Sequence, residues 1–463
     1  MSRLVVAAVV LVVLITIFPV LLLIRSTHSD VKLEPVPKAI GTATPLKLRI
    51  ANPHGFRSVT VWLEQNGARE KMFEASRPAH RWSWKGNEAP QELAFNAAAK
   101  KEGKAKIIIE VDSNDLRGST DTASYDVEVI TRPPTVVADG VQHYINQGGS
   151  ELVVFTPAGS WVEAGVHAGK YTSRSFPKPG SSTERFSLFA YPWDLPSDTI
   201  PVVYVKNVAG TEATARFWTK IFPKKFRQRD IELSDSFLDK VLAELDPSGT
   251  GDKVERFLKI NRDMRRENNQ TLADLRLKTA ERFLWSGPFL QLANSKVESQ
   301  FADVRTYVYK GKKVDTQVHL GFDLSVVQHT AVVAANDGIV LWADRLGIYG
   351  NCIVVDHGYG LQSVYGHLSS IGVKVGDAVK KGQEMGRSGA TGLAGGDHLH
   401  FTMQVDGTQI NPVEWWDAHW IQDRVLSKIN GSVKASTAGG AAAPVAEKEH
   451  RPSRPAKAHH RRK

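Results

Sequence analysis

The sequence predicts a multidomain, mainly β protein that begins with a transmembrane helix and ends in a disordered tail. Between these ends we expect two β-sandwich-like (Ig-like) domains, a helical segment and a C-terminal glycine-rich antiparallel β domain. Three observations carry this prediction: an uncharged apolar run at the start, repeated apolar/polar alternation between turn residues, and one central stretch with helical periodicity. The length of 463 residues allows roughly two to four domains.

Residues 1–30 are predicted to form an N-terminal transmembrane anchor. Positions 4–24 are 21 residues without a charge, enough helix to cross about 30 Å of hydrocarbon. Residues 21–24 are bulky where a cleavable signal peptide needs small residues, so we expect an uncleaved anchor, with cleavage as the alternative. The expected location is the inner (cytoplasmic) membrane, single-pass, with everything after Arg25 on the exported side, periplasmic or extracellular.

Two β domains are predicted to follow, over residues 31–132 and 133–229. Alternating runs such as 46–50 are separated by turn residues, which favours an immunoglobulin-like sandwich without the cysteine pair of antibody domains. Pro133 and Pro134 mark the boundary between the domains, because neither residue can donate to a β ladder.

Residues 230–288 are predicted to form a helical segment. Ser234 is a possible N-cap, an apolar stripe follows it, and Asp246 with the next proline stops the run. Thr271 is expected to open a second helix with a pattern that resembles a capping box. The basic stretch 224–229 before these helices is interpreted as a solvated linker. The helices could cover the groove of the next domain or serve as a plain spacer.

Residues 289–420 are the expected glycine-rich antiparallel β domain, and 421–463 the disordered tail, which is rich in Ala, Gly and Pro and then basic. Residues 447–463 hold seven Lys and Arg against two Glu, half of the net charge of +10. This basic end could contact an anionic wall polymer or a lipid surface, or remain solvated. Nucleic acid is not expected as a partner, because the rest of the chain is only mildly basic.

Cysteine usage excludes two kinds of stabilisation. Cys352 is the only cysteine, so neither an intramolecular disulfide nor a zinc–thiolate cluster can form. It stands in an apolar run that reads as a buried strand, which favours a structural role. The apolar fraction of 42% is ordinary for globular domains with real cores.

The most specific feature is a set of possible metal ligands in the C-terminal domain: His319, Asp323 and His400, with His398 beside them. Two neutral imidazoles and one carboxylate suit zinc, and three protein ligands leave the fourth tetrahedral position open for water, as in catalytic sites. Residues two apart face the same side of a strand, so His398 and His400 can converge. The four-residue spacing of His319 and Asp323 suits a strand or a helix, and Gly321 favours the strand. Each pair alone could be an ordinary surface pair.

A hydrolytic zinc site also needs a proton acceptor. The chain has no His-Glu-x-x-His motif, so the helix-borne glutamate base of the common zinc proteases is missing. The remaining candidates nearby are histidines, which can titrate near neutral pH. His329 and His357 are interpreted as structural.

Short motifs in the C-terminal domain match a known family in order. They are FADVR (301–305), HLGFDL (319–324), DHGYG (356–360), YGHLS (365–369), GDAV (376–379), GRSGATG (386–392) and HLHF (398–401). On these motifs residues 301–416, about a quarter of the chain, resemble the lysostaphin/LytM-type zinc metallopeptidases, which cut peptide bonds in bacterial cell-wall peptidoglycan.

The resemblance implies a LytM-type fold and a role for each site residue. His319, Asp323 and His400 would bind Zn²⁺, while His367 and His398 would form the catalytic pair that acts on the bound water and the oxyanion. Spacing alone does not single out His367. The resemblance leaves out residues 31–290, so any protein partner of the two β domains stays open.

Three hypotheses follow. The first is a membrane-anchored zinc metalloendopeptidase (peptidoglycan endopeptidase), with peptidoglycan peptides as substrate. The second is a catalytically silent LytM-fold activator of a cell-wall amidase; such proteins usually lack a metal or catalytic residue, and none is missing here. The third is a membrane-fusion adaptor with a lipoyl-like hairpin at 376–383; such an adaptor would need no metal and catalytic residues of this kind.

Overall fold

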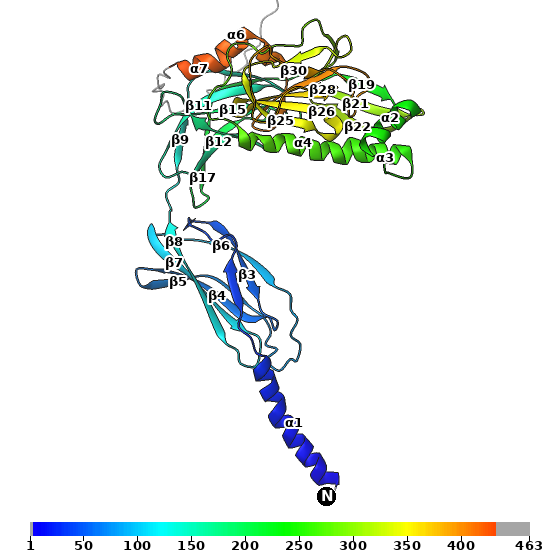
Figure 1. Ribbon diagram of the computed structural model, residues 1–463. Coiled ribbons are helices and arrows are strands. Elements are labelled where there is room, and N and C mark those ends of the chain that lie inside the picture. The colour runs from blue at the N-terminus through cyan, green and yellow to red at the C-terminus, as the bar shows by residue number, and fades with distance from the viewer. Residues whose placement is uncertain (1–2, 432–463) are drawn as a thin grey trace, which may run out of the picture.

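The computed structural model describes residues 3–431 (Figure 1). Helix α1 (Arg3–Arg25) leads into a slender β domain, and a larger body follows (Figure 1). Within the described part of the chain, no helix is long and apolar enough to span a membrane. The membrane anchor stays a prediction. The mainly β character is confirmed.

The first β domain consists of two sheets around one core. Their strands are β1 (Asp30–Leu33), β2 (Ala39–Ile40), β3 (Thr44–Ala51), β4 (Phe56–Gln65), β5 (Ala68–Ser76), β6 (Gln91–Ala97), β7 (Gly103–Ser113) and β8 (Thr120–Val129). The sheet orders are β1-β3-β6 and β2-β8-β7-β4-β5. Leu46, Leu48 and Ile50 of β3 are buried while the residues between them are exposed, as the alternation predicts.

The second β domain has two four-stranded sheets, β14-β15-β11-β9 and β13-β12-β16-β17, and a parallel pair, β10 and β18. The strands are β9 (Thr135–Ala138), β10 (His143–Asn146), β11 (Ser150–Ala158), β12 (Glu163–Ala168), β13 (Tyr171–Arg174), β14 (Phe176–Pro177), β15 (Arg185–Ala190), β16 (Val202–Lys206), β17 (Glu212–Arg216) and β18 (Thr219–Phe222).

The C-terminal domain is built on a long antiparallel sheet, β20-β23-β31-β27-β26-β25-β29, with β32 paired to β31. Smaller sheets, β19-β21-β22 and β24-β30-β28, accompany it. The strands are β19 (Gln228–Glu232), β20 (Lys296–Ser299), β21 (Asp303–Tyr309), β22 (Lys312–His319), β23 (Phe322–Ser325), β24 (Ala331–Val333), β25 (Gly338–Arg345), β26 (Asn351–Gly358), β27 (Leu361–Leu368), β28 (Ser370–Ile371), β29 (Ala378–Val379), β30 (Glu384–Arg387), β31 (Leu399–Val405) and β32 (Thr408–Ile410).

The helical segment comprises α2 (Asp235–Leu245), α3 (Lys253–Lys259), η1 (Ile260–Met264), α4 (Arg265–Asp274) and η2 (Leu275–Lys278). The Ser234 side chain accepts from the backbone N–H of Phe237, which confirms the predicted cap. The predicted helix start at Thr271 is wrong. Asp252 caps this helical run by accepting from two backbone N–H groups, so Thr271 falls near the end of α4.

Both faces of the long sheet are covered, by different parts of the chain. Along β26, Cys352 and Val354 pack with the helical segment. Ile353 and Val355 point to the opposite face, into a core shared with the second β domain. A strand buried on both faces reads as a continuous apolar run. The helices and the second β domain therefore belong to one body with the C-terminal domain (Figure 1).

The interpretation of 224–229 as a solvated linker is wrong at its end. β19 begins at Gln228 and pairs in parallel with β21 of the C-terminal domain. Arg227 forms an ion pair with Asp303, whose side chain is 1% exposed. A buried carboxylate needs a cationic partner, and this stretch supplies one.

The predicted tail boundary at 421 is wrong for its first residues. Helix α5 (Val413–Trp416) is followed by α6 (Ala418–Ile421), η4 (Gln422–Leu426) and α7 (Ser427–Asn430). A short 3₁₀ turn, η3 (Gly347–Tyr349), lies between β25 and β26. Ile421, Val425 and Ile429 are four residues apart and buried in the shared core. Lys428 donates to Glu151 at 2.7 Å. Residues 432–463, with the basic end, lie outside the described residues.

Glu414 should make the stability of this body depend on pH. It is buried and accepts from Ser150 N–H at 2.9 Å and Asn146 Nδ2 at 2.8 Å. Burial raises the pKa of Glu414 from 4.5 to about 7. The folded state then holds a proton that the unfolded state loses, so stability falls as pH rises from about 4.5 to 7.

We expect Glu414→Gln to flatten this part of the pH dependence. Urea unfolding between pH 4.5 and 8 would show wild type losing up to about 3 kcal/mol relative to the variant. Glu267→Gln, at an exposed position on α4, is the matched control. Parallel stability curves for wild type and Glu414→Gln would contradict the expectation.

Candidate metal site

Three predicted ligand residues meet at the ends of neighbouring strands. His319 ends β22, Asp323 lies in β23, and His400 lies in β31 directly opposite Asp323 in register. His319 Nε2 lies 2.9 Å from Asp323 Oδ1 and 3.0 Å from His400 Nδ1. His400 Nδ1 lies 3.2 Å from Asp323 Oδ1. Two nitrogens and one oxygen therefore face one point, as a metal site requires.

The expectation that His319 and Asp323 share one strand is wrong. β22 ends at His319 and β23 begins at Phe322, with Gly321 in the break. A Cβ at Gly321 would lie 2.5 Å from His400 Cε1 and 2.9 Å from the Phe401 carbonyl oxygen. A side chain at this position would clash with His400. Glycine therefore lets the chain between β22 and β23 pass close to His400, next to the other two ligands.

Burial sets the charge states of the group. The exposed fractions of the side chains are 4% for His319, 12% for Asp323 and 6% for His400. Burial lowers the pKa of His319 to about 4 and lowers that of His400. Burial would raise the pKa of Asp323, but the charge and hydrogen bond of His319 hold it well below 3.8. Neutral imidazoles and an ionised carboxylate are the forms that bind metal.

The hydrogen bonds around the group orient its donor atoms. His319 Nδ1 lies 3.1 Å from the Gln300 carbonyl oxygen and must donate to it, so in the neutral ring Nε2 keeps a lone pair. His400 turns Nδ1 toward the other two atoms, and its buried Nε2 has no partner among the described residues. The residues present thus fit a divalent metal.

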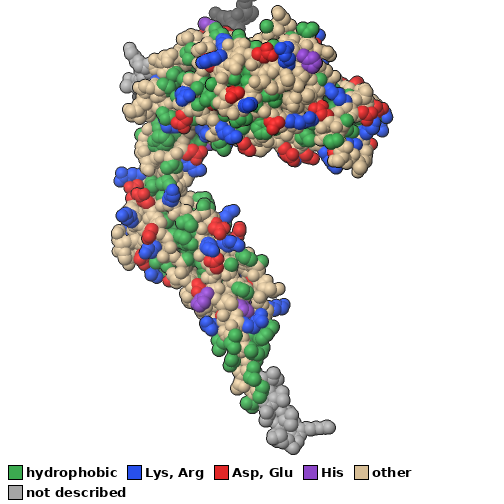
Figure 2. Space-filling model, viewed as in Figure 1, with side chains coloured by type: hydrophobic (Ala, Val, Ile, Leu, Met, Phe, Trp, Pro, Cys, Tyr) green, Lys and Arg blue, Asp and Glu red, His purple; other side chains and the backbone are tan. Residues whose placement is uncertain are grey.

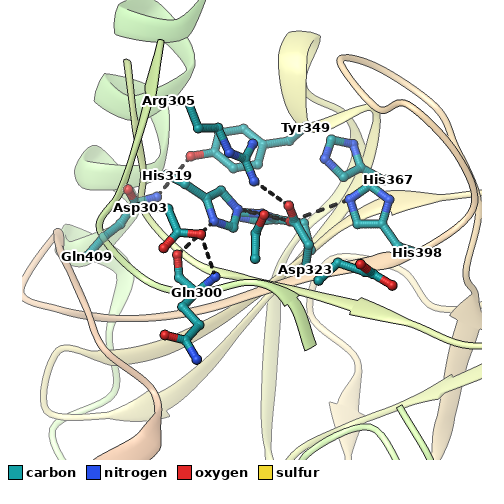
Figure 3. A network of polar contacts seen from close by, with 12 residues as sticks. Gln300, Asp303, Arg305, His319, Asp323, Tyr349, His367, His398 and Gln409 are labelled. Atoms are coloured by element: carbon teal, nitrogen blue, oxygen red, sulfur yellow. Dashed lines mark hydrogen bonds and ion pairs between the residues drawn. The ribbon is translucent and has the colours of Figure 1, made fainter. Parts of the chain in front are cut away.

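His367 and His398 lie beside this group, and both rings face Asp323 (Figure 3). Their centroids are 4.8 Å apart. His367 Nδ1 donates to the Thr391 carbonyl and His398 Nδ1 to the Gly396 carbonyl, each at 2.8 Å. His398 Nε2 lies 3.4 Å from Asp323 Oδ1.

The two rings differ in their affinity for a proton. Burial and the charge of His398 hold the pKa of His367 well below 6.5. Burial opposes protonation of His398 too, but its hydrogen bond to Asp323 raises its pKa. His367 therefore binds a proton less readily than His398 does. The structure brings all five predicted site residues together.

Sequence reasoning missed the residues that hold the ligands. Arg305 pairs with Asp323 Oδ2, which leaves Oδ1 facing the candidate metal position (Figure 3). Asp303 accepts from the backbone N–H of Gln300 at 3.1 Å, next to the carbonyl that orients His319. Both Asp303 and Arg305 belong to the motif FADVR, which could have pointed to them from the sequence.

We expect Asp303→Asn to lower metal affinity about ten- to a hundredfold, because groups that orient metal ligands commonly have effects of this size. Losing the charge weakens the pair with Arg227 and loosens the Gln300 loop. Titration against a competing chelator measures the change. Asp344→Asn, at an exposed position of the same domain, should bind metal as wild type does. Equal affinity in all three proteins would contradict the role of Asp303.

The two histidines interpreted as structural stay outside the group. His357 is buried between the Asp337 carbonyl at 2.8 Å and Ser363 Oγ at 2.7 Å. Burial lowers its pKa to about 4. His329 is 62% exposed and contacts Ser369 Oγ.

The helical segment borders the site. Lys240 Nζ donates to the carbonyl oxygens of Ala390 and Ala394, and Glu244 accepts from Gly392 N–H. Arg265 and Asn269 of α4 line the cavity that contains the histidines. The helical segment therefore forms part of the cavity wall. The sequence had left two roles open for it, a cover over the groove or a plain spacer.

Comparison with known proteins identifies the family of the C-terminal domain. Residues 317–412 match the model of "Peptidase family M23", so this part of the chain is an M23 peptidase domain. The domain has curated and structural neighbours of the LytM/lysostaphin type, and the resemblance covers only part of the chain.

Three relatives match the chain over short stretches, each at 38% identity. An uncharacterized metalloprotease of Haemophilus influenzae aligns over 26% of this chain and 25% of its own length. Peptidoglycan DD-endopeptidase ShyA of Vibrio cholerae aligns over 21% and 22%, and murein hydrolase activator EnvC of Escherichia coli over 20% and 23%. The chain thus spans about a quarter of the length of these relatives.

Among solved structures, the catalytic domain of lysostaphin from Staphylococcus simulans is 28% identical. The match covers 31% of this chain and 96% of that chain, with a TM-score of 0.21.

Proposed function

We propose that this protein is a zinc metalloendopeptidase that hydrolyses peptide bonds in bacterial cell-wall peptidoglycan. The observation that carries the proposal is the complete constellation: His319, Asp323 and His400 face one point, with His367 and His398 beside them. The exported, membrane-anchored location rests on the sequence alone and is part of the proposal.

His319 Nε2, Asp323 Oδ1 and His400 Nδ1 would hold the zinc ion. When bound, zinc polarises the scissile carbonyl and lowers the pKa of a water molecule from 15.7 toward about 7. Arg305 keeps the Asp323 carboxylate in place through its second oxygen. The backbone carbonyl of Gln300 keeps the His319 lone pair turned inward.

The two remaining histidines take complementary roles in this proposal. His367 is neutral, with its Nδ1 proton committed to Thr391, so its Nε2 can accept the proton of the attacking water. His398 donates from Nδ1 to Gly396 and can also carry a proton on Nε2. That proton can stabilise the negative charge that develops on the substrate carbonyl oxygen.

A second candidate function is an activator of a cell-wall hydrolase. EnvC, a murein hydrolase activator by name, matches this chain with the same 38% identity as ShyA, a peptidoglycan DD-endopeptidase by name. Identity therefore does not separate the two functions. The presence of all five site residues favours the enzyme.

The test is digestion of purified peptidoglycan by the full chain, with fragments identified by mass spectrometry. We expect new peptide termini, loss of activity with a chelator, and recovery with Zn²⁺. No cleavage by zinc-loaded protein, together with stimulation of an added amidase, would overturn the proposal in favour of the activator.

A further inference from the structure

A second cavity beside helix α4 shares part of its lining with the cavity at the metal site. The site cavity has a volume of about 110 Å³ and the second cavity one of about 370 Å³, and Arg265 and Asn269 line both. These two residues are four apart and so share one face of α4. The helix thus forms part of the wall of both cavities.

The lining of these cavities is strongly cationic. It holds four arginines, Arg262, Arg265, Arg266 and Arg305, and one carboxylate, Asp323. Acidic and basic side chains lie side by side along the edge of the body where α3 and α4 run (Figures 1 and 2). Three of the four arginines form an ion pair with a nearby aspartate.

Arg265 differs from its neighbours in having no acidic partner. Arg262 pairs with Asp315, Arg266 with Asp263 and Arg305 with Asp323. Arg265 donates only to the backbone and side-chain oxygens of Asn261, through Nε and Nη2. Among the described residues no carboxylate pairs with it, and its Nη1 takes part in neither bond.

Two further donors line the site cavity without partners. Asn269 Oδ1 accepts from the Tyr349 hydroxyl at 2.8 Å, while its Nδ2 has no partner among the described residues. Arg305 Nε is buried and also lacks a partner there. Only Arg305 Nε is fully buried, and a buried donor without an acceptor costs free energy. Asn269 is partly buried, so its Nδ2 is open to an incoming acceptor.

We propose that Arg265 and Asn269 form an anion subsite that binds a carboxylate of the substrate next to the cleaved bond. The proposal rests on the proposed peptidase function and names a substrate feature of that same site. A planar guanidinium with an adjacent amide donor suits a carboxylate, which accepts two hydrogen bonds at once. The carboxylate can belong to a side chain or to a chain end.

The test uses cross-linked stem peptides that differ only in their carboxyl groups. One peptide has all carboxyl groups free, one has its side-chain groups amidated, and one has its chain ends amidated. Binding to the metal-free full chain and cleavage by the zinc-loaded full chain are both measured. Wild type should prefer the free acid about ten- to a hundredfold over one amidated peptide, which identifies the source of the carboxylate.

Arg265→Gln should remove that preference while leaving the amidated peptide almost unaffected. Arg265→Lys keeps the charge and should retain part of the preference. Lys259→Gln removes an exposed charge of α3 that lines neither cavity and should behave as wild type. Circular dichroism and urea unfolding check that each variant is folded.

The outcomes separate the subsite from the catalytic function. A preference for the acid in binding, without cleavage of either peptide, supports the subsite and contradicts the endopeptidase. Equal binding of acid and amidated peptides by wild type, or an unchanged preference in Arg265→Gln, overturns the subsite even when cleavage is efficient.

Discussion

We expect His400→Ala to abolish metal binding and to lower peptide hydrolysis about a thousandfold or more. The substitution removes one of three donor atoms that lie within 3.2 Å of one another. Polarisation of the carbonyl by a bound metal is worth several kcal/mol, which corresponds to this loss of rate. His400 is preferred to Asp323 as the first variant, because removing Asp323 would also leave Arg305 without its ionic partner.

The measurement is metal content per chain together with release of peptide fragments from peptidoglycan. Asp323→Asn keeps the side-chain shape and should give the same loss of metal. His419→Ala, at a side chain that is 85% exposed, removes a histidine outside the site and should match wild type. Wild-type metal content in His400→Ala would refute the assignment of this ligand.

The second large effect is expected at His367 and His398. Alanine at either position should retain the metal and lower kcat about a hundred- to ten-thousandfold, the range for loss of a positioned acid or base. Neither ring is part of the His–Asp–His group, so its removal leaves the three donor atoms in place. A variant that keeps its metal but loses turnover would distinguish a catalytic histidine from a metal ligand.

The two histidine variants should differ in their pH profiles. Loss of the proton acceptor His367 should weaken the dependence on the acidic side of the profile, and loss of the donor His398 on the basic side. Rates of a defined peptide from pH 5 to 9 compare them. Stoichiometric loss of metal in both variants would instead place these rings among the ligands.

Local pattern was sufficient for one pair of site residues. His398 and His400 converge because residues two apart share a strand face. The apolar run around Cys352 predicts a buried strand, which is β26. The pattern was insufficient for the break at Gly321, because its cause is the approach of His400 from a strand about eighty residues later. It also misplaced the tail, since Ile429 is buried only through packing on distant residues.

Residue type and spacing were enough to propose His319, Asp323 and His400 as ligands, because both are local properties of the sequence, whereas the role expected for His367 came from the family resemblance. The surroundings of these residues, in contrast, depend on the packing of distant segments. Arg227 stabilises Asp303, and Arg265 of α4 lies at the wall of a site formed by His319 and His400. A hydrophobic face indicates that a helix or strand is buried but not against what, because the partner surface is formed by packing between distant segments.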